Sequence, residues 1–206
     1  MSDRSRAGPS ATDLIHHPYV APSGFESVVP GVHKGSTVLF CDVADLHSRQ
    51  WKDKSGYTYG LHGTPTSFTL EERLATLEGG RQCLLTPSGL SAISLVDMAV
   101  LKAGDELVLP DNAYGPGKDF ALVELARWGV TTRFYDSQNP ESLASAITPA
   151  TRLVWLEAAG SVTLEFPDLL GLLRVCRQHP NVCVALDNTW GAGLASSPAW
   201  TSASMR

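Results

Sequence analysis

From Thr69 onward, short apolar runs alternate with stretches in which apolar residues recur at helical spacing. The apolar runs predict strands at Gln82–Thr86, Glu106–Leu109, Thr131–Tyr135, Arg152–Leu156 and Val182–Leu186. The stretches between them predict helices at Gly89–Lys102, Lys118–Trp128, Glu141–Ile147 and Asp168–His179. This alternation is typical of βαβ units. It predicts a three-layer α/β fold, with a mainly parallel sheet between two layers of helices.

The helix expected before the first strand has signals at both of its ends. Thr69 and Glu72 stand at the spacing of a capping box, which predicts that the helix begins beside Thr69. Gly79 and Gly80 follow the last helical residues and predict the C-terminal end of the helix.

The first 55 residues show no sustained period, because Pro, Gly and Ser interrupt their apolar positions. Only Ser36–Phe40 has the pattern of a strand. A segment of this kind gains little by folding on itself, so it must lie against its own domain or against a second subunit. We therefore expect an extended N-terminal arm over residues 1–55 and one α/β domain over residues 56–206.

Composition and charge exclude several classes of protein. The net charge of −5 is dispersed over both signs, whereas a nucleic-acid-binding protein usually carries a basic stripe. No apolar run approaches the ~20 residues of a membrane span, and the N-terminal arginines precede no apolar segment of the kind that a signal peptide has. We therefore expect a cytoplasmic protein that binds neither nucleic acid nor membrane.

The cysteines and the paired histidines do not indicate a metal site. Cys41, Cys83, Cys176 and Cys183 form no CxxC pair and have apolar neighbours in sequence. This favours reduced core thiols over disulfides or metal ligands. His16–His17 has no cysteine or carboxylate at ligand spacing, so we expect no metal there.

Three predicted strand ends carry polar or aromatic residues, and each has two interpretations. Ser88–Gly89 at a helix start suits a phosphate, although a simple N-cap by Ser88 explains it better alone. Tyr114 lies in a rigid loop, where its ring could stack on a planar ligand or remain at the surface. Asp187 follows a buried apolar run directly, which is unusual for a carboxylate without a ligand. Neither GxGxxG nor a Walker motif is present, so a dinucleotide or nucleoside triphosphate is poorly supported.

Taken together, a phosphate cradle, an aromatic ring and a carboxylate at one sheet edge fit a phosphorylated heterocycle with a basic ring nitrogen. Pyridoxal phosphate is such a molecule. A carboxylate paired with its ring nitrogen keeps that nitrogen protonated, and the protonated ring withdraws electrons from a substrate carbanion.

The segments YTYGLHGTPTSFTLEERLATLEGG, PDNAYGPGKDF and VALDNTWGAG stand in the order and spacing of a known family. From about Val38 to about Leu194 the chain resembles the Cys/Met-metabolism family of pyridoxal-phosphate enzymes, whose large domain has fold type I. The resemblance implies that pyridoxal 5'-phosphate is bound by Gly89, Leu90, Tyr114, Asp187, Thr189 and Tyr59. In that set, the backbone N–H groups of Gly89 and Leu90 bind the phosphate, Tyr114 stacks on the ring, and Asp187 pairs with the pyridine nitrogen. Tyr59 reaches the phosphate of the neighbouring subunit, which implies a homo-oligomer, a tetramer in the complete family enzyme.

The resemblance also implies an activity: a carbon–sulfur lyase of the cystathionine β-lyase type. Such an enzyme converts cystathionine to homocysteine, pyruvate and ammonia in methionine biosynthesis. A γ-synthase or γ-lyase of the same family is the alternative reaction. A non-catalytic fragment that binds cofactor or another subunit is the alternative of a different class.

The chain departs from the family pattern in three places. Leu61 stands where the family often has a phosphate-binding arginine, and His62 replaces it only in part. The family's Schiff-base lysine follows the aspartate, but all five lysines here precede Asp187. We therefore expect residues 56–206 to form a partial large domain without the C-terminal domain, inactive, poorly stable and prone to association. The tail at 195–206 lacks the family pattern, and we expect it to derive from a shifted reading frame.

Overall fold

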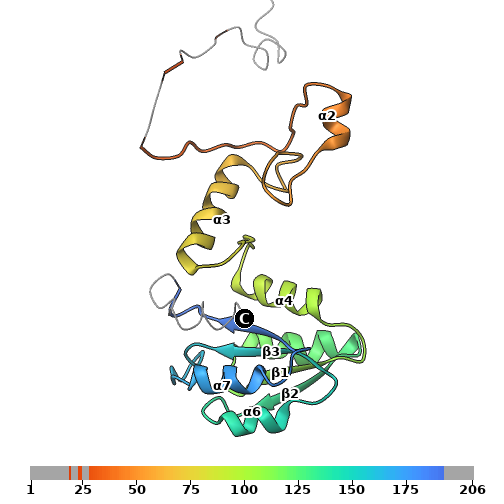
Figure 1. Ribbon diagram of the computed structural model, residues 1–206, viewed down its shortest axis with the longest axis vertical. Helices are drawn as coiled ribbons and strands as arrows, with labels where there is room; N and C mark the ends of the chain where they lie inside the picture. The colour runs from red at the N-terminus through yellow and green to blue at the C-terminus, as the bar shows by residue number, and fades with distance from the viewer. Residues whose placement is uncertain (1–18, 20–22, 25–27, 193–206) are drawn as a thin grey trace, which may run out of the picture.

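The computed structural model of the protein describes residues 19, 23–24 and 28–192. At the centre of the described part is one parallel sheet in the strand order β2-β1-β3-β4 (Figure 1). Its strands are β1 (Glu106–Pro110), β2 (Thr131–Tyr135), β3 (Thr151–Glu157) and β4 (Cys183–Asp187). All three strand pairs are parallel, which confirms the predicted α/β fold with a mainly parallel sheet.

Helices cover both faces of the sheet; one of them precedes β1 in the chain, and the others connect successive strands (Figure 1). They are α4 (Gly89–Val100), α5 (Gly115–Asp119), which runs into the π-helical turn η1 (Phe120–Leu125), α6 (Pro140–Ala146) and α7 (Leu169–Cys176). The last strand, β4, is followed by residues 188–192, with which the described part of the chain ends. The predicted helices therefore occur where the periodicity placed them, with ends that differ by a few residues.

The core has two halves because successive strand side chains point to opposite faces of the sheet. Leu107 and Leu153 belong to the cluster that packs against α4 and η1. Val108 and Val154 belong to the cluster that packs against α6 and α7. All four side chains are fully buried, so each face of the sheet excludes water and the domain has three layers.

The strand order places a topological switch point between β1 and β3. From β1 the chain moves to β2 on one side, and it then crosses back to β3 and β4 on the other side. The loops that leave the carboxyl ends of β1 and β3 consequently diverge, and the crevice between such loops is where ligands bind in open α/β sheets.

Two predicted strands are wrong. Among the described residues, neither Ser36–Phe40 nor Gln82–Thr86 pairs with a strand. Both have apolar residues suited to a strand, but a strand also needs a neighbour for its backbone hydrogen bonds. The edges of the sheet are β2 and β4, and neither segment lies against them.

The helix α3 (Pro65–Glu78) begins one turn before the predicted start. Thr64 is its N-cap, and Thr64 and Ser67 bond reciprocally as a capping box. The Thr69 hydroxyl instead donates to the Pro65 carbonyl inside the helix, at 2.6 Å. Proline favours the first helical position, so Thr64–Pro65 is the stronger start signal. The predicted end is confirmed, because Gly79 caps the helix in the left-handed conformation.

The described part of the arm includes one helix that the sequence pattern did not predict, α2 (Val43–Ser48). Figure 1 shows α2 on the side of α3 that faces away from the sheet. Lys54 anchors this region: its ammonium group lies 3.1 Å from Glu71 and 2.7 Å from Glu72, both on α3. The boundary of the arm at residue 55 stays a prediction.

The structure also corrects the expectation of core thiols. Cys176 is buried and Cys83 is partly buried, but Cys41 and Cys183 are exposed. His16–His17 and the tail at 195–206 lie outside the described residues. Within the described ranges, none of the helices has the length and apolar character needed to cross a bilayer.

Candidate functional site

A cavity of about 390 Å³ opens at the carboxyl ends of β3 and β4, beside the start of α4. We call it the strand-end cavity; its lining residues are Ser88, Gly89, Leu90, Ile93, Tyr114, Glu157, Ser161, Asp187, Thr189 and Trp190. The volume lies within the range usual for small-molecule sites. Five of the six residues expected to bind a cofactor line this one cavity, and only Tyr59 does not.

The N-terminus of α4 supplies backbone donors to the strand-end cavity. The Ser88 hydroxyl accepts a hydrogen bond from the Ser91 N–H at 3.1 Å, so Ser88 is an N-cap as the simpler interpretation held. The N–H groups of Gly89 and Leu90 come first in the helix and have no intrahelical acceptor. A Cβ added to Gly89 would meet no atom within 4 Å, which shows that its backbone faces open space. Two free donors and the positive end of a 12-residue helix therefore suit an anionic group.

Asp187 is the last residue of β4 and is partly buried at the cavity wall. Its Oδ1 accepts hydrogen bonds from the Thr189 backbone N–H, at 2.9 Å, and from the Thr189 hydroxyl. Thr189 thus fixes the orientation of the carboxylate. Among the described residues no group bonds to Oδ2, which leaves this oxygen available to a donor in the cavity.

Tyr114 reaches the cavity from the loop between β1 and α5. Its backbone is held on both sides: the N–H donates to Glu157 Oε1 at 2.9 Å, and the carbonyl accepts from the Gly117 and Lys118 N–H groups. The side chain remains 40% exposed. A fixed backbone with an accessible ring is the arrangement that stacking on a planar ligand requires.

Glu157 lines the same cavity and is not among the residues predicted from the sequence. It is the last residue of β3, is 6% exposed, and stands opposite Asp187 in the strand register. Burial raises the pKa of the Glu157 carboxyl to about 7; the Tyr114 N–H opposes this shift, and the charge of Asp187 adds to it. The signal that marked Asp187, a carboxylate directly after a buried apolar run, was present at Glu157 as well.

Tyr59 lies apart from this cavity, in the turn between the arm and α3. It is 45% exposed, and its ring makes an edge contact with His62 at 6.0 Å between centroids. His62 also stacks on Trp51 and places its Nδ1 2.8 Å from the Thr58 hydroxyl. Leu61 points into solvent, 84% exposed. The described chain therefore does not bring this turn to its own strand-end cavity.

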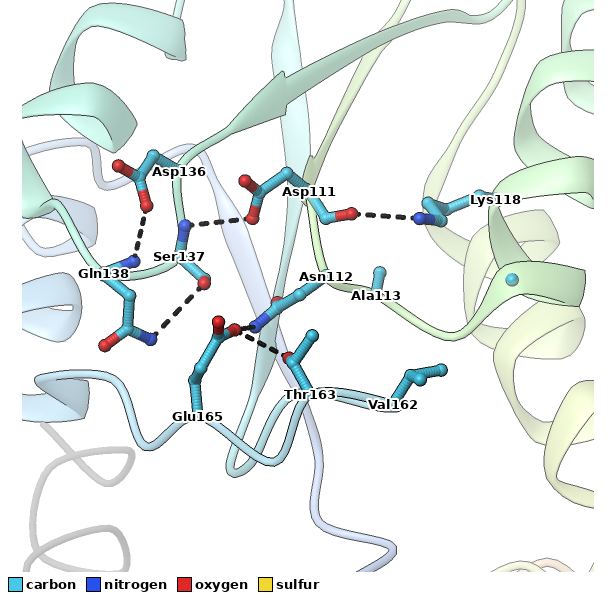
Figure 2. Close-up of a pocket in the computed structure, with 11 residues that line it drawn as sticks. Asp111, Asn112, Ala113, Lys118, Asp136, Ser137, Gln138, Val162, Thr163 and Glu165 are labelled. Carbon is cyan, nitrogen blue, oxygen red and sulfur yellow. Dashed lines mark hydrogen bonds between the residues drawn. The ribbon is translucent and has the colours of Figure 1, made fainter.

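A second cavity, of about 420 Å³, is lined in part by Asp111, Asn112 and Ala113, which belong to the loop that carries Tyr114 (Figure 2). Its walls include Asp111, Asp136 and Glu165, an acidic set that does not suit a phosphate. Figure 2 shows that its polar groups bond to one another: Glu165 Oε2 accepts from the Asn112 side-chain amide at 3.0 Å and from the Thr163 hydroxyl at 2.7 Å. These bonds fasten the loop after β3 to the loop that carries Tyr114.

The strand-end cavity thus presents two backbone donors for an anion, an accessible aromatic ring and a carboxylate with one free oxygen. The first suits a phosphate, the second a planar ring, and the third a protonated ring nitrogen. The residues present fit pyridoxal phosphate, because each of its recognisable groups has a counterpart of suitable chemistry in the same cavity.

Comparison with known proteins agrees with this chemistry. A model of the family described as Cys/Met metabolism PLP-dependent enzyme matches residues 11–203. The chain is 39% identical over 168 residues to a cystathionine beta-lyase from Bordetella avium, covering 80% of the chain and 42% of that protein. It is 33% identical over 189 residues to an L-methionine gamma-lyase from Porphyromonas gingivalis, covering 91% of the chain and 47% of that protein.

A solved structure supports the same relationship. The crystal structure of metB from Corynebacterium glutamicum superposes with a TM-score of 0.74 and 26% sequence identity, covering 88% of this chain and 45% of that one. The chain spans less than half the length of the relatives it matches. The family model covers most of the chain, residues 11–203, and the chain belongs to the family of Cys/Met metabolism PLP-dependent enzymes.

Proposed function

We propose that this chain forms the cofactor-binding part of a carbon–sulfur lyase that acts on cystathionine, of the cystathionine β-lyase type. The observation that carries the proposal is the convergence of Gly89, Leu90, Tyr114, Asp187 and Thr189 on one cavity. The identity to a cystathionine beta-lyase supports the choice of substrate class. The cytoplasmic location expected from the sequence stays a prediction.

The residues of the cavity have separate roles in this proposal. Pyridoxal phosphate, when bound, supplies an electron-withdrawing ring that stabilises negative charge on the substrate. Asp187 would keep a proton on the pyridine nitrogen through its free Oδ2, while Thr189 holds the carboxylate in place. The Gly89 and Leu90 N–H groups would bind the phosphate, and Tyr114 would stack on the ring.

A γ-lyase reaction is the second candidate, because an L-methionine gamma-lyase is also similar to the chain. The two reactions leave different products from cystathionine. Cleavage on the β-carbon side yields pyruvate, whereas cleavage on the γ-carbon side yields 2-oxobutanoate. Identifying the oxo acid formed by an enzyme that contains this chain therefore decides between them.

We expect the 206-residue chain to bind pyridoxal phosphate without turning over cystathionine. All five of its lysines precede Asp187. Lys118, which lines the small cavity beside Tyr114 and Asp187, donates to the Asp111 carbonyl at 2.9 Å and is therefore already engaged.

Titration with pyridoxal phosphate should quench the fluorescence of Trp190, which lines the strand-end cavity. The Trp190→Phe variant identifies the part of the fluorescence change that comes from this residue. Pyridoxal without its phosphate should bind more weakly. A turnover number of about 1 s⁻¹ or more would contradict the expectation.

We also propose that the protein assembles as a homo-oligomer in which Tyr59 binds the phosphate held by a second chain. Tyr59 is exposed and remote from its own cavity. Apolar side chains are exposed on α3 and α4 as well, among them Leu70, Leu77, Leu95 and Met98. Several exposed apolar side chains on two successive helices are typical of a surface that is buried against another copy of the chain.

A mixing experiment tests this arrangement. Tyr59→Phe and Asp187→Ala chains should each bind pyridoxal phosphate poorly when alone. If the site is shared, a refolded equimolar mixture should recover about one site in four, since a hybrid dimer contains one intact site. Sedimentation of the mixture reports its assembly. A mixture that binds no better than the average of its parents would contradict a shared site.

A further inference from the structure

Glu157 has no role in the proposed site so far, although it is the most deeply buried acid on the wall of the strand-end cavity. This inference rests on the proposed function. We propose that Glu157 is a positioning residue, which holds the Tyr114 loop in place and couples the strength of pyridoxal-phosphate binding to its own protonation.

The first support is the geometry at the ends of β3 and β4. Glu157 and Asp187 are register partners on adjacent parallel strands, and the Ala158 N–H donates to the Asp187 carbonyl at 2.9 Å. From this fixed point the Glu157 side chain spans to the loop after β1, where its Oε1 accepts the Tyr114 N–H at 2.9 Å. One side chain thus connects Tyr114, which would stack on the ring, with β3, and β3 in turn pairs with β4, the strand that bears Asp187.

The second support is a small inner cavity behind the site, of about 20 Å³. Tyr114, Glu157, Asp187 and Asp97 all line it. Its size suits a single water molecule, which needs polar partners of the kind these residues supply. Asp97 is 1% exposed and accepts the Trp155 indole N–H at 2.8 Å, so its carboxyl group is buried and held in place at the wall of this inner cavity.

The third support is the set of charges around Glu157. Asp187 on β4 repels its negative form, and Lys118 on α5 stabilises it. Tyr135 on β2 also senses the charge of Glu157. Burial, the largest influence, raises the pKa of Glu157 to about 7. The carboxyl group therefore gains and loses its proton near neutral pH.

Each protonation state has a different effect on the site. An ionised Glu157 makes a charge-assisted hydrogen bond to the Tyr114 N–H, which is stronger than the bond that a neutral carboxyl accepts. It also places a second negative charge near the ring nitrogen that Asp187 keeps protonated. Both effects favour tighter binding of the cofactor as Glu157 ionises. A glutamine at this position retains the acceptor oxygen but never acquires the charge.

The Glu157→Gln variant therefore isolates the charge. At about pH 5.5 the wild-type chain and the variant should bind pyridoxal phosphate equally well, whereas at about pH 8.5 the wild type should bind about 3- to 10-fold more tightly. Taking the ratio of the two dissociation constants at each pH removes the titration of the cofactor itself. A ratio that stays constant over this range would overturn the proposed coupling.

The pH dependence of folding stability independently checks the direction of the Glu157 pKa shift. The pKa of Glu157 is raised from 4.5 to about 7 on folding, so the folded chain binds more protons than the unfolded chain between these values. Wild-type stability is thus expected to fall as pH rises through this window, relative to Glu157→Gln. Parallel melting curves for the two chains at every pH would contradict a buried, titrating Glu157.

The positioning role is tested without any cofactor. Amide hydrogen exchange of the Tyr114 N–H, followed by NMR, should be slow in the wild type and in Glu157→Gln but at least about 10-fold faster in Glu157→Ala, which has no acceptor. Equal protection in all three chains would overturn the role. Absence of pyridoxal-phosphate binding in the wild type would instead overturn the proposed function, and with it the coupling, while the exchange rates still decide the positioning of Tyr114.

Discussion

Replacing Asp187 with alanine is expected to weaken pyridoxal-phosphate binding by about 10- to 100-fold, the largest effect of any single change in the cavity. The free Oδ2 is the acceptor available to the protonated ring nitrogen, and a hydrogen bond between two charged groups is among the strongest in proteins. Without it the nitrogen loses its proton more readily, and the neutral ring has less affinity for the site.

Two further variants make this expectation specific. Asp187→Asn retains the shape of the side chain but removes its charge, so it should bind almost as weakly as Asp187→Ala. Glu124→Ala removes an exposed carboxylate whose partner is Arg127 on the outer surface of the helix, and it should bind like the wild type. Dissociation constants from fluorescence titration measure all three. Wild-type affinity in Asp187→Ala would show that the carboxylate does not contact the ring nitrogen.

Replacing Leu153 with alanine is expected to lower the free energy of unfolding by about 2–5 kcal/mol. Leu153 lies on β3, which has a neighbouring strand on each side, and its side chain is 0% exposed. It packs with Leu107 and Leu125 between the sheet and the layer formed by α4 and η1. Alanine would leave a void that the paired strands cannot close without breaking their hydrogen bonds.

Leu122→Ala is the matched control, because Leu122 lies on η1 with 51% of its surface exposed. Its substitution should change stability by at most about 0.5 kcal/mol. Urea denaturation followed by far-ultraviolet circular dichroism compares both variants with the wild type. Equal midpoints for Leu153→Ala and Leu122→Ala would mean that the sheet does not form the core described here.

Local sequence patterns were sufficient wherever neighbouring residues decide the outcome. The strand Thr131–Tyr135 was predicted with its observed bounds, and the helix that begins at Gly89 was predicted from its first residue. Asp187 was placed at the end of a strand because an apolar run stops there, although β4 is an edge strand that is only partly buried and not the buried strand that was expected. Short-range interactions determine the bounds of these elements, because hydrophobic periodicity and helix capping involve residues only a few positions apart.

Other local predictions failed because a stronger neighbour or a missing partner decided the result. Thr64 followed by Pro65 starts α3, so the capping-box spacing at Thr69 lies inside the helix. Gln82–Thr86 has the composition of a strand, but among the described residues it has no strand to pair with. A strand is stable only with hydrogen-bonding neighbours, and no local pattern reports whether they are present.

The residues of the candidate site were likewise found partly from the sequence and partly from the tertiary structure. Motif and residue type alone identified Gly89, Tyr114 and Asp187, because each lies at a strand or helix end that the pattern reveals. Glu157 carries the same sequence signal as Asp187, but its contacts required the tertiary structure: its hydrogen-bond partner, Tyr114, is 43 residues away, and its proximity to Asp187 depends on the register of β3 against β4. Burial then determines its charge, since a carboxyl group enclosed by strand ends and loops ionises less readily than the same residue in water.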